Sequence, residues 1–189
     1  MTFNGAVPKF GQNVTLGHNI RFGDNVVVWQ NATICDDCII GEGVVIGSNV
    51  WIGKKVTIGA GSRIQHGAFI PNGTNIGTSV FIGPNVTLTD DRYPTCNKTS
   101  PYTAEPPIVE DLCAIGAGAV ILPGVRIHRG SLVGAGAVVT HDVPRFVTVV
   151  GAPAAIMGYG RKITEKQDQA TSIACGIMDP NHASQTETV

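Results

Sequence analysis

Residues 10–87 repeat a six-residue pattern without a gap. The first position of each step is large and apolar, in a series of thirteen: Phe10, Leu16, Phe22, Val28, Ile34, Ile40, Ile46, Ile52, Ile58, Ile64, Ile70, Ile76 and Ile82. Since about half of the residues of an average protein are apolar, chance would produce such a series on the order of once in ten thousand. The fourth position is Gly, Asn or Asp in eleven of the thirteen steps, and Lys55 and Ser79 are the exceptions.

Each step predicts a short strand followed by a corner. The fifth, sixth and next first positions form a strand whose ends point inward and whose middle points outward. The remaining positions form the turn, where Gly and Asn adopt a positive φ at low cost. A period of six fits neither a helix nor a long alternating strand. We therefore expect a chain that closes a triangle every eighteen residues and stacks parallel strands about 4.8 Å apart.

This repeat resembles the hexapeptide signature of left-handed parallel β-helix acyltransferases. The left-handedness comes from that resemblance, because the usual preference for right-handed crossovers favours the opposite hand. The predicted fold class is all-β: a left-handed parallel β-helix with one external loop and a short C-terminal extension.

The register stops after Leu88 and resumes at Val109, which is 21 residues later and not a multiple of six. The intervening segment carries four prolines and clustered charge, so it predicts a loop inserted between coils. Nineteen hexads predict about six turns. We expect an acyltransferase domain over residues 1–158, with a loop excursion at about 88–108, and a partly mobile extension over residues 159–189.

Composition narrows the function classes. The net charge of −1 gives no electrostatic argument for nucleic acid or membrane binding. The start lacks the pattern of a secretion signal, and no apolar run approaches the roughly 20 residues that span a bilayer, so a cytoplasmic location is expected. Cys35 and Cys38 form a lone C-x-x-C whose register predicts a corner residue and a core filler, so no metal is expected.

Two outward columns carry apolar side chains. One column runs Thr15, Thr33, Trp51, Phe69 and Thr87, and the other runs Val27, Val45, Arg63 and Phe81, each at eighteen-residue spacing. Apolar side chains stacked outside a solenoid favour a subunit contact, and scattered surface hydrophobes are the alternative. The family resemblance implies a homotrimer with active sites between neighbouring subunits.

The segments IGAGAV (115–120) and VGAGAV (133–138) also lie eighteen residues apart. They stack Gly116 under Gly134 and Ala117 under Ala135, and the same spacing leads on to Ala152 and Pro153. A smooth edge with exposed amides suits the pantetheine arm of coenzyme A, although tight corners need small residues in any case. The phosphates also need cations, and those near this end are Arg126, Arg129, Arg145, Arg161 and Lys162. The predicted cofactor-binding residues are Gly116, Ala117, Gly134, Ala135, Arg126, Arg161 and Lys162.

The segment FIGPNVTLTDDRYP (81–94), with RIQHGAFIPNG before it and VVGAPA after the repeats, resembles bacterial nucleotide-sugar N-acetyltransferases. That resemblance implies acetyl-CoA as donor and a dTDP- or UDP-linked 3-amino sugar as acceptor, for surface polysaccharide or glycan precursor synthesis. It implies substrate contacts from Asn72, Asp91, Tyr93, Gln65 and Phe81. The family pattern F-T-N-D-x-x-P puts Asp90 where the family has Asn, and Ala155 departs from a basic family position.

Other function classes fit less well. Sugar or serine O-acetyltransferases of this fold need a loop histidine to deprotonate a hydroxyl, and none of the five histidines lies in residues 88–108. A γ-type carbonic anhydrase needs three zinc-binding histidines, two of them closely spaced, and no such pair exists. A non-catalytic scaffold remains an alternative that would not require the loop.

Asp90 is the predicted catalytic residue. It could pair with a sugar ammonium and then accept a proton as general base, whereas the family's Asn could only orient the amine. The alternative is that Asp90 caps the loop turn. No Ser or Cys stands beside a His in the motif, so we expect direct attack of the amine on the thioester without a covalent enzyme intermediate.

Overall fold

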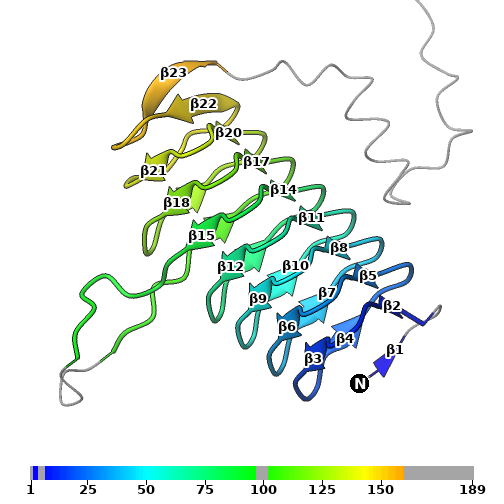
Figure 1. The fold of residues 1–189 in the computed structure, drawn as a ribbon. Helices are drawn as coiled ribbons and strands as arrows, with labels where there is room; N and C mark the ends of the chain where they lie inside the picture. The colour runs from blue at the N-terminus through cyan, green and yellow to red at the C-terminus, as the bar shows by residue number, and fades with distance from the viewer. Residues whose placement is uncertain (1, 4–6, 97–101, 160–189) are drawn as a thin grey trace, which may run out of the picture.

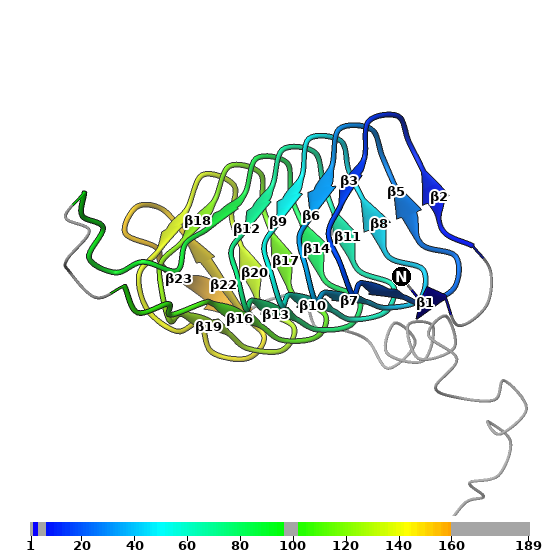
Figure 2. The same cartoon turned by 90° about the horizontal axis from the view of Figure 1, so that it is seen from below.

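The six-residue repeat becomes a triangular solenoid of parallel strands in the computed structural model, which describes residues 2–3, 7–96 and 102–159 (Figure 1). Successive strands belong to three different sheets, and each sheet runs as a ladder along the long axis (Figure 2). The described residues contain strands and turns, so the predicted all-β class is confirmed, and the stacking is that of a left-handed β-helix.

Three sheets form the sides of the solenoid. Sheet A contains β1 (Thr2–Phe3), β4 (Arg21–Phe22), β7 (Ile39–Ile40), β10 (Thr57–Ile58), β13 (Asn75–Ile76), β16 (Ile108–Val109) and β19 (Arg126–Ile127). Sheet B contains β2 (Lys9–Phe10), β5 (Val27–Val28), β8 (Val45–Ile46), β11 (Arg63–Ile64), β14 (Phe81–Ile82), β17 (Ala114–Ile115), β20 (Leu132–Val133), β22 (Val147–Val150) and β23 (Ala155–Tyr159). Sheet C contains β3 (Thr15–Leu16), β6 (Thr33–Ile34), β9 (Trp51–Ile52), β12 (Phe69–Ile70), β15 (Thr87–Leu88), β18 (Val120–Ile121) and β21 (Val138–Val139).

Pairing follows the predicted eighteen-residue spacing, as in Thr57 beside Asn75 and Phe69 beside Trp51. The spacing differs at β1 (nineteen residues), across the inserted loop (33 residues) and between β20 and β22 (sixteen residues), and β23 folds back antiparallel on β22 and ends sheet B. The solenoid is longer than the six turns that the hexads predicted, because β1 and β22 add coils at its two ends.

The first positions fill the core. From Ile34 to Ile82 every one of them is at most 1% exposed, which gives a continuous aliphatic column inside the triangle. Three fifth positions, Ser62, Thr74 and Ser131, carry buried hydroxyls, and each hydroxyl donates to a backbone carbonyl. Ser62 Oγ donates to the Gly77 carbonyl at 2.8 Å, and Thr74 Oγ1 donates to the Pro71 carbonyl at 2.8 Å.

Corner geometry prevails over residue preference. All thirteen fourth positions from Asn13 to Asn85 have a positive φ, including the two exceptions, Lys55 at 57° and Ser79 at 53°. Second positions are often Gly for a different reason. A Cβ at Gly59 would lie 2.5 Å from the backbone carbon of Gly77, in the coil above. The corners with Gly at this position are therefore pressed against the next coil.

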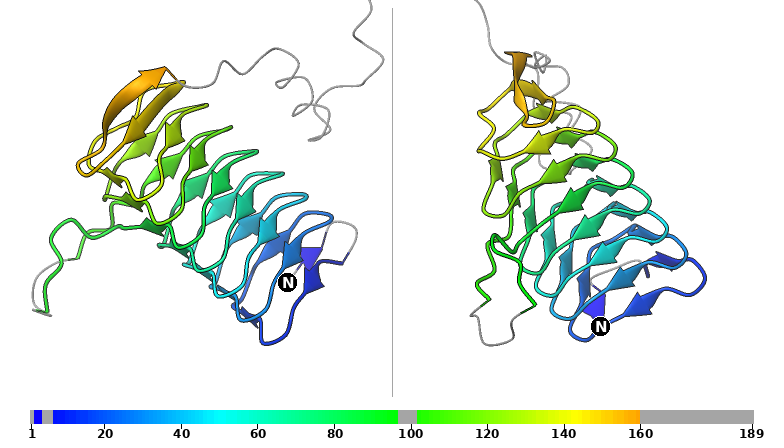
Figure 3. Two further views of the ribbon diagram at one scale, coloured as in Figure 1. Left: turned by 45° about the horizontal axis from the view of Figure 1, so that its top comes forward. Right: turned by 60° about the vertical axis from the view of Figure 1, so that its left-hand side comes forward.

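The insertion lies where the sequence predicted it. Thr87 pairs with Val120 across 33 residues instead of 18, so fifteen extra residues leave the solenoid between β15 and β16. Figure 3 shows this loop projecting away from the coils. Its base is closed by the Glu105 amide, which donates to the Asp90 carbonyl at 2.8 Å.

The last coil corrects one prediction. Leu132 pairs with Thr148 and Ile127 bridges Val143, both across sixteen residues, so the chain loses two residues after β21. Val150 therefore lies against Gly134, where a Cβ would be 2.7 Å from Val150 Cγ1. The expected continuation of the small-residue column to Ala152 and Pro153 is wrong.

Cys38 is the buried core filler that the register predicted, and burial raises the pKa of its thiol to about 11. Burial also raises the pKa of the Cys35 thiol. Within the described ranges no helix is long and apolar enough to span a bilayer. The extension after Tyr159, with Arg161 and Lys162, lies outside the described residues.

Candidate functional site

Two edges of the solenoid carry most of the predicted site residues. We call the corners that lead from sheet B to sheet C the Gly-Ala edge; they comprise residues 65–67, 83–85, 116–118 and 134–136. We call the corners that lead from sheet C to sheet A the loop edge; they comprise residues 71–73, 89–91, 105–107 and 122–124. Sheet C separates the two edges, so one chain does not bring them together.

The middle residue of each corner is the third position of the six-residue repeat, and its backbone amide points out of the coil. At four corners a side chain from the next coil accepts its hydrogen. The bonds are His18 to Asp36 Oδ1 (2.9 Å), Ser48 to His66 Nδ1 (2.9 Å), Lys54 to Asn72 Oδ1 (2.7 Å) and Thr78 to Asp111 Oδ1 (2.8 Å). These side chains cap the backbone of the coil before them.

Ala117 and Ala135 occupy the same third position on the Gly-Ala edge, and neither amide has a hydrogen-bond partner in the described part of the chain. The residue one coil above Ala117 is Ala135, which has no side-chain acceptor. Both alanines are exposed, and a Cβ added at the neighbouring Gly118 or Gly136 would meet nothing within 4 Å. The His66 amide, lower on this edge, is also without a partner among the described residues, but Ala117 and Ala135 are the two free donors that stand one coil apart with no polar side chain beside them.

Packing explains part of the glycine pattern. A Cβ at Gly116 would lie 2.5 Å from the Ala135 nitrogen, so this glycine serves the close approach of the next coil. Gly118 and Gly136 each have a φ of 68°. Gln65, predicted to contact substrate, lies on the same edge below these residues, and His66 follows it.

The loop edge holds Asp90 at the mouth of the insertion. The Tyr102 hydroxyl, from the returning arm of the loop, donates to Asp90 Oδ2 at 2.6 Å. This bond to the carboxylate raises the pKa of Tyr102 to about 12. Sequence reasoning missed Tyr102, because nothing in the repeat predicts which loop side chain folds back on the first arm.

The other residues predicted on this edge have structural partners. Asp91 Oδ1 accepts the Tyr93 amide hydrogen at 3.0 Å, which makes a local turn. Tyr93 itself is 81% exposed. Asn72 lies one coil below Asp90 by register, but its side-chain oxygen accepts from Lys54.

A second missed feature fixes the loop at its base. Arg92 donates from Nε and Nη2 to Glu105 Oε2, at 3.0 and 2.7 Å, and Nη2 also donates to the Pro123 carbonyl at 2.8 Å. The Glu105 carbonyl accepts from the Gly124 amide at 2.7 Å. Both arms of the loop are thereby tied to the next coil.

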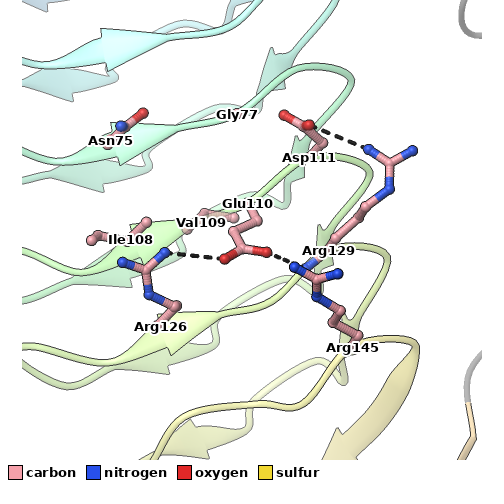
Figure 4. A pocket seen from close by; sticks show the side chains of 9 residues that line it. All are labelled: Asn75, Gly77, Ile108, Val109, Glu110, Asp111, Arg126, Arg129 and Arg145. Carbon is pink, nitrogen blue, oxygen red and sulfur yellow. Dashed lines mark hydrogen bonds and ion pairs between the residues drawn. The ribbon is translucent and has the colours of Figure 1, made fainter.

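The two remaining predicted residues lie elsewhere. Phe81 is exposed on sheet B, in β14. Arg126 is on sheet A, in β19, and it lines a hollow of about 370 Å³ with Arg129 and Arg145 (Figure 4). The structure thus places Arg126 away from the Gly-Ala edge of its own chain. Within residues 2–3, 7–96 and 102–159, no group of three or more His, Cys, Asp or Glu side chains could hold a metal ion.

The fold and these edges define a class, the hexapeptide-repeat β-helix. The family described as "Bacterial transferase hexapeptide (six repeats)" matches residues 19–54 and 106–141, and the "Hexapeptide repeat of succinyl-transferase" matches residues 49–90. The chain belongs to the hexapeptide-repeat transferase superfamily, as the sequence resemblance predicted.

Among curated proteins, the chain is similar to a 2,3,4,5-tetrahydropyridine-2,6-dicarboxylate N-acetyltransferase of Staphylococcus aureus, at 43% identity over 81 residues. That match covers 43% of this chain and 33% of the relative, so the chain spans about a third of the curated relatives that it matches.

Two solved structures are also similar. A hexapeptide-repeat acetyltransferase of Vibrio cholerae, complexed with acetyl coenzyme A, is 26% identical, with a TM-score of 0.57 and coverage of 65% of this chain and 71% of that chain. A variant of GDP-perosamine N-acetyltransferase from Caulobacter crescentus, in complex with CoA and GDP-perosamine, is 28% identical, with a TM-score of 0.53 and coverage of 76% and 58%.

The Arg92 contacts generate a prediction about loop dynamics. In Arg92→Lys the charge stays, but one ammonium cannot reproduce the fork that joins Glu105 and Pro123. Arg92 and Glu105 are 45% and 38% exposed, so solvent screens their ion pair and we expect only a small loss of local stability at the base of the loop. Hydrogen exchange at the Glu105 and Gly124 amides should then accelerate roughly fivefold. Arg63→Lys, at an exposed arginine of sheet B, is the control, and unchanged exchange in Arg92→Lys would show that the fork does not hold the loop.

Proposed function

We propose that this chain is an acetyl-CoA-dependent N-acetyltransferase that acts in the cytoplasm on the amino group of a nucleotide-linked sugar, a dTDP- or UDP-3-amino-3-deoxy sugar, for surface polysaccharide or glycan precursor synthesis. The observation that carries the proposal is the Gly-Ala edge, with the unpaired amides of Ala117 and Ala135. Residues at the mouth of the inserted loop, above all Asp90, would bind the acceptor sugar. Solved relatives that bind CoA, one of them with an amino-sugar nucleotide, support the reaction class.

The donor would lie along the Gly-Ala edge. The pantetheine arm is thin and carries amide carbonyls, which can accept hydrogen bonds from the Ala117 and Ala135 amides. Ala and Gly leave that surface open, whereas larger side chains or a capping acceptor from the next coil would block the amides. Acetyl-CoA bound in this way presents its thioester at the end of the pantetheine arm, and a thioester is by its own chemistry reactive toward an amine.

The acceptor would meet Asp90. A sugar amine arrives mostly as ammonium, pairs with the carboxylate, and gives up a proton to it or through it to water. The neutral nitrogen then attacks the thioester carbonyl carbon, the carbon–sulfur bond breaks, and the departing thiolate takes up a proton. Tyr102 donates to Asp90 Oδ2, so it orients the carboxylate and leaves Oδ1 for the amine.

Bringing the two edges together requires neighbouring copies of the chain. Trp51 and Phe69 stack on the outer face of sheet C, with ring centroids 4.7 Å apart and planes 7° from parallel. We propose a homotrimer in which this face turns toward a three-fold axis. The loop edge of one subunit then lies beside the Gly-Ala edge of the next.

A three-fold axis that runs parallel to the long axis of the solenoid relates the subunits without any shift along that axis. Residues at the same height along the solenoid therefore meet across the subunit boundary. Asp90 shares a coil with Pro84 on the Gly-Ala edge. Gln65 lies one coil below that height, and Ala117 one coil above it. Across the subunit boundary Asp90 would thus stand between a substrate residue and a donor residue of its neighbour. This arrangement unites the separated parts of the site.

The assembly is tested at Trp51. Trp51→Glu puts a charge into the proposed apolar contact, and burying it unpaired is costly, so light scattering should give the mass of a monomer at micromolar concentration. Thr57→Glu makes the same kind of change on sheet A and should leave the mass of a trimer. A wild-type protein that is monomeric at that concentration would remove the shared-site arrangement.

The reaction is tested directly. Purified protein is incubated with acetyl-CoA and a panel of dTDP- and UDP-linked 3-amino and 4-amino sugars, and release of free thiol is followed. We expect thiol release that depends on a 3-amino sugar, with the matching 3-hydroxy sugars as controls. Turnover of the hydroxy sugars at an equal rate would reassign the chain to O-acetyl transfer, and no turnover of any sugar would reject the substrate class.

The role of Asp90 is tested by Asp90→Asn, which keeps the shape and loses the charge. We expect kcat to fall by about 10²–10⁴-fold while the trimer stays intact. Asp37→Asn is a matched control, because Asp37 lies exposed on an earlier corner of the same edge with a φ of 61° that Asn also adopts. Full activity of Asp90→Asn across pH 6–9 would reduce Asp90 to a residue that only shapes the turn.

A further inference from the structure

The hollow on sheet A gathers charged residues from two directions. Its floor is Asn75 and Ile108, which precede Arg126 in the outward column of that sheet. Its rim is the edge that leads from sheet A to sheet B, with Asp111, Arg129 and Arg145 at successive coils. The hollow therefore lies on a different edge of the solenoid from both Asp90 and Ala117.

Glu110 organises the centre of the hollow. Its Oε1 accepts from Arg126 Nη1 at 3.0 Å and contacts His128 Nδ1 at 3.1 Å, and its Oε2 accepts from the Arg129 amide at 3.0 Å. These bonds hold the pKa of Glu110 below its ordinary value, led by the bond from the Arg129 amide. The carboxylate thus has its acceptor capacity in use and fixes the Arg126 side chain from one side.

The arginines keep donors to spare. Arg126 donates from Nη1 to Glu110, and its Nη2 and Nε make no hydrogen bond or ion pair with the described residues. Arg145 makes no hydrogen bond or ion pair with any described residue. In the view of Figure 4, Arg126 and Arg145 flank Glu110. Three guanidinium groups face two carboxylates in this lining, so the hollow keeps an excess of positive charge.

We propose that this hollow is a binding site for a phosphate group, held between Arg126 and Arg145. A guanidinium presents a planar set of N–H donors that matches phosphate oxygens, and Arg126 is already fixed by Glu110, so little side-chain entropy is lost on binding. The volume of about 370 Å³ exceeds that of one phosphate, and the floor offers the Asn75 amide and the apolar Ile108 side chain to the remainder of a phosphorylated small molecule. This inference is independent of the proposed acetyl transfer.

Direct binding to the full chain tests the site. Pyrophosphate and adenosine 3′,5′-bisphosphate are titrated calorimetrically into the protein at low ionic strength and without acetyl-CoA. We expect both probes to bind with one site per chain, and Arg145→Ala to weaken both roughly tenfold or more, since it removes one of the two flanking guanidiniums. A preference for the bisphosphate would indicate a phosphate ester as the ligand, and a preference for pyrophosphate would indicate an inorganic anion.

Arg21→Ala is the matched control. Arg21 is an exposed arginine in the outward column of the same sheet, several coils from the hollow, so it tests for non-specific attraction by surface charge. Arg145 has no partner in the described structure, and its removal should leave the circular dichroism spectrum unchanged. Equal binding by the wild type, Arg145→Ala and Arg21→Ala would overturn the proposal, as would a wild-type protein that binds neither probe.

Discussion

The close approach of each corner to the coil above it governs the rest of this structure. A Cβ at Gly41, Gly59 or Gly116 would lie 2.5 to 2.6 Å from the backbone of the next coil, so successive coils touch at their corners as well as along their strands. Three six-residue sides set the eighteen-residue spacing, strand pairing and these corner contacts maintain it, and the spacing fixes which side chains share a column. The buried isoleucine column, the capped corner amides and the two small-residue corners all follow from it.

Periodicity made most of the fold predictable. The inward positions, the three-sided closure and the place of the insertion could be predicted because each depends on local spacing. Positive φ at Lys55 and Ser79 shows that the coil imposes its corner even on residues that disfavour it. The two-residue slip after β21 could not be predicted, because His141 and Asp142 fit a hexad in sequence, and only the pairing of Val143 with Ile127 reveals the shortened corner.

The site was less predictable than the fold. The eighteen-residue spacing placed Gly116 beneath Gly134 and Asp90 above Asn72, but it could not predict which corners of the solenoid lie close to one another. The structure puts these residues on edges that sheet C separates. Tyr102 and the contacts of Arg92 with Glu105 and Pro123 join residues of the loop or of different coils without a fixed period, so their signal is absent from the sequence pattern. Arg126 illustrates the same limit, since nearness along the chain to the glycine-rich segments did not place it on their edge.

The capping of corner amides has a consequence for how such a scaffold can change. A side-chain acceptor at the third position of one coil serves the coil before it, as Asn72 serves Lys54 and His66 serves Ser48. Replacing that acceptor with alanine uncovers a backbone donor without altering the path of the chain. A groove on this solenoid can therefore be lengthened or shortened by one exposed amide per coil, through substitutions that leave the strands and the core as they are. Whole coils can likewise be gained or lost elsewhere along the solenoid, because each coil depends only on its immediate neighbours.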